Sequence, residues 1–146
     1  MDNVFKEFIS LYFVFMLVII QLGIFIAAKL SGWSFLATKY LDRDSSYITY
    51  RRFQSMRMGW CNFSACMSFA VAPEGLHMKI FFLFSAGHPP LLIPWKAFKH
   101  VNKSRWRFFL GHTFIIDDEG KGIKLRLPEG VSNDILTQGD VISYSN

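Results

Sequence analysis

The sequence predicts an α+β protein: one N-terminal transmembrane helix, followed by a mainly antiparallel β domain that ends in a short helix. Residues 8–28 carry no charge, and the remaining chain alternates short β-rich segments with turns that contain Gly or Pro. The 146 residues are 51% hydrophobic and 18% charged, and the mean hydropathy is +0.24. This composition excludes an intrinsically disordered chain, and the length fits one domain.

The uncharged run at residues 8–28 is expected to span a membrane. Only Ser10 and Gln21 are clearly polar in it. As a helix it would be about 31 Å long, which matches a hydrocarbon core of about 30 Å. A cleaved signal peptide is the alternative, but the flank 1–7 contains Asp2 and Glu7, and the apolar run is longer than that of a signal peptide. We therefore favour an uncleaved anchor.

Charge on the two sides of this segment predicts its orientation. Lys29, Lys39 and Arg43 are the first of several basic residues that follow the helix, whereas only Lys6 precedes it. The positive-inside rule then places residues 29–146 in the cytoplasm.

Residues 29–45 are expected to form a short amphipathic helix or linker next to the membrane. Apolar side chains recur at helical spacing, and Ser31 can cap the start of the helix. Trp33 and Tyr40 can lie near the lipid headgroups. For Trp33, packing on the following domain is an equal alternative.

Residues 46–146 are expected to form the β-rich domain. Short strands at this spacing predict an antiparallel barrel or sandwich. The predicted strands are 47–50, 63–71, 76–84, 91–93, 106–116 and 122–127. Turns are expected at 73–75 and 117–121, and residues 131–136 can form one or two helical turns with Ser132 as the cap.

Several short motifs follow one another within residues 51–95. Arg-Phe-Gln-Ser at 52–55 precedes Gly-Leu at 75–76, Gly-His-Pro-Pro-Leu at 87–91 and Ile-Pro-Trp at 93–95. This series resembles a group of small bacterial single-pass membrane proteins of unknown function. The group often has an Arg just before the Gly-His-Pro-Pro step, where this chain has Ser85-Ala86. The resemblance implies a bacterial inner-membrane protein and no particular activity.

The order of these features is also similar to that of pleckstrin-homology (PH) and GRAM-type barrels. In that class a strand that begins with Gly-Leu is followed by a strand leading to Ile-Pro-Trp and then by a basic segment, here 98–101. The resemblance implies a PH-like split barrel. It implies no function, because one fold carries many functions.

His88 and Trp95 are candidate binding residues. His88 lies in a loop that Pro89 and Pro90 make stiff, and its side chain can titrate near neutral pH. The alternative is a buried histidine that bonds to the backbone and holds the turn. Trp95 is expected in or near the core.

Residues 96–107 form a basic segment without any acid. Its cations are Lys96, Lys99, Lys103, Arg105 and Arg107. If an anchor holds this segment at a leaflet, each charge can gain roughly 1 kcal/mol from anionic lipid. A solvated strand face is the alternative. Nucleic acid is not an expected partner, because the net charge of +5 is modest and no binding motif is present.

Catalytic and metal-binding motifs are not found in the sequence. It contains no GxSxG, P-loop, HExxH or GxGxxG motif. Cys61 and Cys66 would lie on opposite faces of one strand, which suits neither a disulfide nor a metal site. The acids at 117–119 fall in a predicted turn, where solvated carboxylates are common. We therefore expect no cofactor and no metal.

These features predict a non-enzymatic binding or scaffold module at the cytoplasmic face of the membrane. Its expected partners are the lipid bilayer and either anionic lipid or another membrane protein. The alternative is an enzyme, or a subunit of one, with a site around His88.

Overall fold

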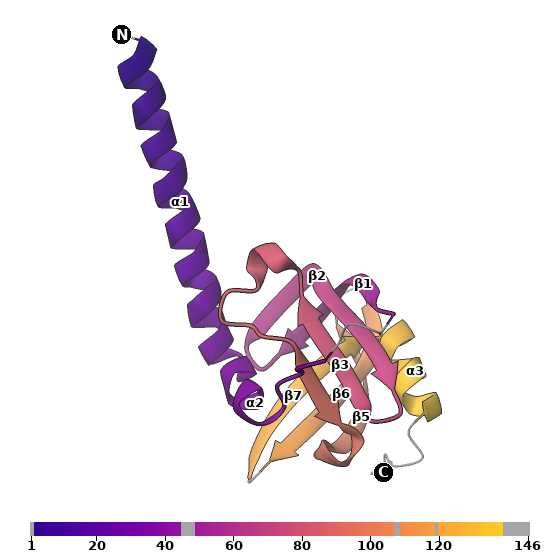
Figure 1. Cartoon of the computed structure of the whole chain (residues 1–146). Coiled ribbons are helices and arrows are strands. Elements are labelled where there is room, and N and C mark those ends of the chain that lie inside the picture. The colour runs from indigo at the N-terminus through magenta and orange to yellow at the C-terminus, as the bar shows by residue number, and fades with distance from the viewer. Residues whose placement is uncertain (1, 45–48, 107–108, 119, 139–146) are drawn as a thin grey trace.

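The computed structural model describes residues 2–44, 49–106, 109–118 and 120–138 (Figure 1). Two helices lead into a series of strands, and a third helix follows the last strand. The helices are α1 (Asp2–Leu30), α2 (Trp33–Lys39) and α3 (Glu129–Gln138), with 3₁₀ turns η1 (Phe82–Phe84) and η2 (Trp95–Ala97). The strands are β1 (Arg51–Met58), β2 (Cys61–Ala72), β3 (Gly75–Ile80), β4 (Leu91–Pro94), β5 (Phe98–Trp106), β6 (Phe109–Asp118) and β7 (Lys121–Pro128).

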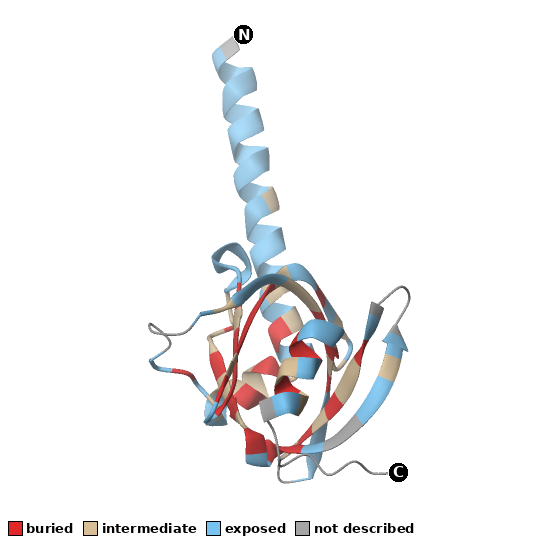
Figure 2. Ribbon diagram, turned by 90° about the vertical axis from the view of Figure 1, so that its right-hand side faces the viewer, coloured by how far each residue is buried: buried red, intermediate tan, exposed pale blue. Residues whose placement is uncertain are grey.

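The strands form one antiparallel sheet with the order β4-β3-β2-β1-β7-β6-β5. The sheet curls into a barrel-like shape, and α3 lies across its open side (Figure 2). Val131 and Ile135 of α3 are buried against the core, and α3 contacts β2, β6 and β7. The predicted class, a helix followed by an antiparallel barrel-like domain with a short C-terminal helix, is confirmed.

The edge of the sheet at β4 is covered by the chain that follows α2. Leu41 forms an isolated antiparallel bridge with Leu91. The backbone N–H of Asp42 donates to Pro90 O at 2.9 Å, and the N–H of Leu92 donates to Tyr40 O at 2.9 Å. An uncovered edge strand invites pairing with another chain. The segment after α2 therefore both protects this edge and fixes α2 to the barrel.

Helix α1 extends well beyond the barrel and is exposed over most of its length (Figure 2). Residues Asn3–Leu30 are long and apolar enough to cross a membrane, with a mean hydropathy of 2.6 in the most apolar window. Within the described part of the chain, the contacts of α1 with the domain lie between Gln21 and Leu30. Ala28 is buried there, and the Cys61 thiol donates to Ala27 O at 3.6 Å.

Trp33 at the start of α2 joins the helices to the barrel. Its side chain is fully buried, and its Nε1–H donates to Pro89 O at 2.9 Å. Its ring lies 5.9 Å from that of Phe63 and 5.1 Å from that of His88, measured between centroids. Of the two positions that the sequence allowed for Trp33, the structure shows packing on the domain.

Strand β1 was not predicted from the sequence. The β-rich segment 47–50 was predicted instead; residues 45–48 lie outside the described part of the chain, and Thr49 and Tyr50 belong to no strand. Strand β1 is hard to recognise because its register shifts twice against β2 and Phe53 has a positive φ of 55°. These irregularities break the alternation by which a strand is recognised.

Other boundaries also differ from the prediction. The strand predicted at 76–84 ends at Ile80, because β4 pairs only with the first part of β3 and the following residues turn away as η1. Trp106 ends β5 rather than starting β6. Ser132 lies inside α3 and is no cap; its hydroxyl donates to Leu127 O at 3.2 Å and accepts from the His112 N–H at 3.3 Å.

Replacement of Trp33 by Ala is expected to lower the free energy of unfolding by about 3–5 kcal/mol, because it leaves a large cavity between α2 and the barrel. Trp60→Ala is the control: Trp60 is 86% exposed, and its loss is expected to cost less than about 0.5 kcal/mol. Denaturant unfolding of the full chain in detergent measures both. Equal losses in the two variants would contradict the assigned role of Trp33.

Candidate functional site

The basic segment predicted as a lipid-binding patch is spread along one edge of the sheet. Lys96 lies in η2, while Lys99, Lys103 and Arg105 follow one another along the edge strand β5, and all four are exposed. At about 3.3 Å per residue, Lys99 and Arg105 are about 20 Å apart. Arg107 lies outside the described residues. The structure therefore does not gather these residues into one cluster.

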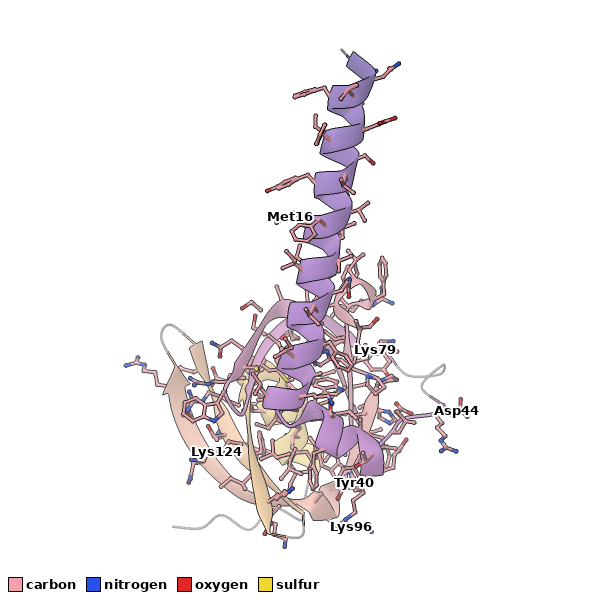
Figure 3. All side chains as sticks on the ribbon, turned by 90° about the vertical axis from the view of Figure 1, so that its left-hand side faces the viewer. Met16, Tyr40, Asp44, Lys79, Lys96 and Lys124 are labelled. Atoms are coloured by element: carbon pink, nitrogen blue, oxygen red, sulfur yellow. The ribbon has the colours of Figure 1, made fainter. Side chains whose placement is uncertain are left out.

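Two positions in this segment also argue against a shared lipid site. Lys99 forms an ion pair with Asp117 at 3.4 Å. Figure 3 shows Lys96 at the end of the domain that is farthest from the exposed length of α1.

His88 is packed between α2 and β2. It is 2% exposed, and its ring meets Trp33 and Phe63 edge-on, at 5.1 and 5.5 Å. Nδ1 of His88 lies 3.1 Å from Ala86 O, so His88 makes the bond to the backbone that is expected of a buried histidine holding the turn. Its Nε2 is buried without a hydrogen-bond partner among the described residues. Burial lowers the pKa of His88, against the smaller opposing effect of the Ala86 bond. The lowered pKa favours the neutral ring, in which Nδ1–H donates to Ala86 O because a carbonyl oxygen only accepts.

Trp95 is a core residue, as the sequence predicts. It is buried, its Nε1–H donates to Ala72 O at 3.0 Å, and its ring lies 5.5 Å from that of Phe98. All of its bonding capacity is used inside the domain. We therefore assign it no part in binding.

A buried histidine that sequence reasoning did not single out links the chain after α2 to β3. His77 is buried, with Nδ1 at 2.7 Å from Asp42 and Nε2 at 3.2 Å from Glu74. The pKa of Glu74 is lowered, first by a bond to its own backbone and then by the bond to His77. Because both ring nitrogens are engaged, His77 has no atom left to act on a substrate. No local signal indicates this link, since Asp42 lies far from His77 in the sequence.

The remaining chemical groups show no catalytic arrangement among the described residues. Cys61 and Cys66 are free and half-buried, and burial raises the pKa of both thiols. Within residues 2–44, 49–106, 109–118 and 120–138, no three His, Cys, Asp or Glu side chains come together as metal ligands do.

A basic cleft lies where α1 ends against the barrel. Its volume is about 690 Å³, and its walls come from the end of α1, the start of α2, the β1–β2 turn and β7. We define the basic cleft by its cations, which are Lys29, Arg57, Lys121, Lys124 and Arg126. No acidic residue in the described part of the chain lines it. Trp60 stands exposed at its rim.

The cations of the cleft are held in place by the sheet. Arg57 and Arg126 are direct partners across the β1–β7 pair. Arg126 donates from Nε to Thr113 at 3.2 Å, and the Lys121 ammonium lies 4.9 Å from the centre of the Phe35 ring. Like charges directly opposite each other destabilise a sheet. The pairing of Arg57 with Arg126 therefore places two positive charges side by side on one face of the sheet.

The basic cleft could not be found in the sequence, because its cations come from three separate segments. Lys124 and Arg126 alternate with the buried Leu125 and Leu127 of β7, so each basic residue reads as an ordinary outward position of a strand. Only the pairing of β1 with β7 brings Arg57 to them.

No protein-family model matches this chain, and no curated protein or solved structure is significantly similar to it.

The burial of His88 predicts a pH dependence of stability. Its folded pKa lies below the value of 6.5 for a free histidine, so the unfolded state binds the proton more readily. His88 therefore contributes to the free energy of unfolding at neutral pH, and this contribution is lost as the pH falls through and below about 6.5. In His88→Gln the difference in melting temperature between about pH 7.5 and 5.5 is expected to shrink. Part of the pH dependence is expected to remain in this variant, because burial also lowers the pKa of His112. Parallel profiles for the wild type and His88→Gln would contradict this expectation.

Proposed function

We propose that this protein is a membrane-anchored, non-enzymatic binding module that holds an anionic lipid headgroup in the basic cleft. The observation that carries the proposal is the composition and place of the cleft: it has five cations and no described acid, and it lies at the end of α1, a helix that is apolar enough to span a membrane. The sequence predicts contact with anionic lipid for residues 96–107; we propose the same kind of contact for the cations of the basic cleft instead.

Location supports lipid as the source of the anion. With α1 in a bilayer, Lys29 in its last turn lies at the membrane surface, and the cleft opens beside it. A cation at this level gains about 1 kcal/mol from an anionic leaflet. The exposed Trp60 at the rim suits the headgroup region, where Trp is enriched.

The closed environment of His88 supports a non-catalytic role. A catalytic histidine must reach a substrate with one ring nitrogen. The His88 ring packs edge-on with the rings of Trp33 and Phe63, and the residue is buried. We therefore favour the binding module over an enzyme with a site at His88.

We further propose that the barrel lies on the cytoplasmic side of a bacterial inner membrane. The support is the excess of basic residues that follows the apolar run 8–28, beginning with Lys29, Lys39 and Arg43.

Binding can be measured by calorimetry on the full chain in neutral detergent. We expect a short-chain phosphatidylglycerol to bind and the matching phosphatidylcholine not to bind, with an affinity that falls as salt rises. The triple variant Lys121→Gln, Lys124→Gln, Arg126→Gln is expected to weaken binding by at least about tenfold, since three charges are lost.

The matched control is the triple variant Lys96→Gln, Lys99→Gln, Lys103→Gln. It also removes three positive charges, but from η2 and the edge strand β5. It is expected to bind as the wild type does. If the control loses affinity as strongly as the cleft variant, the site is not the cleft but a diffuse effect of net charge.

Reporter fusions test the orientation. Alkaline phosphatase joined after Asn146 is expected to be inactive, and a fluorescent protein that folds only in the cytoplasm is expected to be bright, because the positive-inside rule keeps residues 29–146 inside. An active phosphatase fusion would reverse the proposed orientation.

A further inference from the structure

The loop between β3 and β4 exposes an unusual amount of apolar surface. We define the aromatic loop as residues 81–87. Phe82 is 71% exposed and Leu83 is 54% exposed, and Phe81 and Phe84 are also exposed. The sequence has no charged residue between Lys79 and Lys96. Such a surface, outside the core, indicates contact with an apolar partner.

The aromatic loop lies against the side of α1 rather than beyond its end. The Gln21 amide donates to Leu83 O at 3.2 Å. Gly87 faces the same helix, because a Cβ built there would lie 2.8 Å from the Phe25 ring. Figure 1 shows the loop rising from the barrel toward the exposed part of α1. Gln21 is nine residues before Leu30, so the tip of the loop lies about 14 Å along the helix from its end.

This position places the loop at the depth of the apolar helix. The contact with Gln21 lies inside Asn3–Leu30, the segment that is apolar enough to cross a membrane. When α1 is in a bilayer, the tip of the loop is below the level of the lipid headgroups that surround Lys29. The surface of the aromatic loop is therefore continuous with that of the helix.

Several backbone groups of the loop are hydrogen-bonded within the protein. Polar backbone groups must be satisfied within the protein if they enter lipid. Phe81 N–H donates to Cys66 O at 2.7 Å, Phe84 N–H to Phe81 O at 2.8 Å, and Ser85 N–H to Phe82 O at 3.2 Å. The Ser85 hydroxyl also donates to Phe82 O, and Leu83 O accepts the Gln21 amide. The same bond gives the Gln21 amide a partner within the protein.

Two cations lie beside the aromatic loop. Arg52 and Lys79 line a hollow together with Phe53, Phe81 and Phe82. Lys79 lies on the upper side of the barrel, toward the exposed length of α1 (Figure 3). Aromatic tips with basic residues behind them are typical of protein surfaces that enter the boundary between headgroups and acyl chains.

We infer that the aromatic loop inserts into the same bilayer as α1 and forms a second membrane contact of the barrel. The inference rests on the proposed membrane location of α1, though not on the basic cleft. With two membrane contacts, α1 and the barrel cannot turn together about the axis of the helix. Its orientation fixes the basic cleft against the lipid surface.

The test measures the depth of fluorescent labels in vesicles. The full chain with Cys61→Ala and Cys66→Ala receives one NBD-labelled cysteine at a time. The positions are Leu83 and Phe82 in the loop, Val14 in α1, and Lys96 at the far end of the barrel. Circular dichroism confirms that each variant is folded, and lipids with brominated acyl chains serve as the quencher.

We expect quenching at Val14, quenching at Leu83 and Phe82 at least about half as strong, and none at Lys96. Quenching at Val14 without quenching in the loop would overturn the inference and leave the anchor intact. A blue-shifted but unquenched loop label would also overturn it, because a protein and not lipid would then cover the loop. Absence of quenching at Val14 would refute the membrane location itself.

Discussion

The burial of Trp33 determines how the rest of the molecule is arranged. A rigid helix that leaves a membrane can carry its domain in any direction unless the connection is packed. Here the connection is an indole ring enclosed by Phe63 and His88, with its N–H bonded to Pro89. Gly32 makes this possible, because its φ of 87° lets the chain turn sharply between α1 and α2. The barrel is thereby held against the last turns of α1.

A second, polar connection prevents the barrel from opening at the same corner. Asp42 reaches the buried His77 of β3, and the adjacent backbone pairs with the edge of β4. Loss of Asp42 would leave a buried histidine nitrogen without its partner, which is costly in a low-dielectric interior. The two connections have different chemistry and act on neighbouring strands. Together they hold the β3–β4 side of the barrel against the chain that follows α1.

This fixed arrangement gives the proposed function its geometry. The basic cleft and the aromatic loop both lie next to α1, the first at its end and the second alongside it. Cations stabilise contact with headgroups, while exposed phenylalanines gain from leaving water. Neither surface needs the other in order to form. Their common orientation relative to α1 is what makes one lipid surface the natural partner of both.

The sequence by itself determined the features that depend on neighbours in the chain. The apolar run at 8–28, the turn at 73–75 and the helix near the C-terminus follow from local composition, and the buried state of Trp95 follows from its type. Tertiary structure decided the rest. The sequence of the apolar segment Phe82–Phe84 is typical of a strand. In the structure β4 does not extend far enough to pair with it, so the segment forms a 3₁₀ turn with exposed side chains. The basic cleft arises because antiparallel pairing places Arg57 opposite Arg126, and pairing between segments far apart is not encoded in either segment alone.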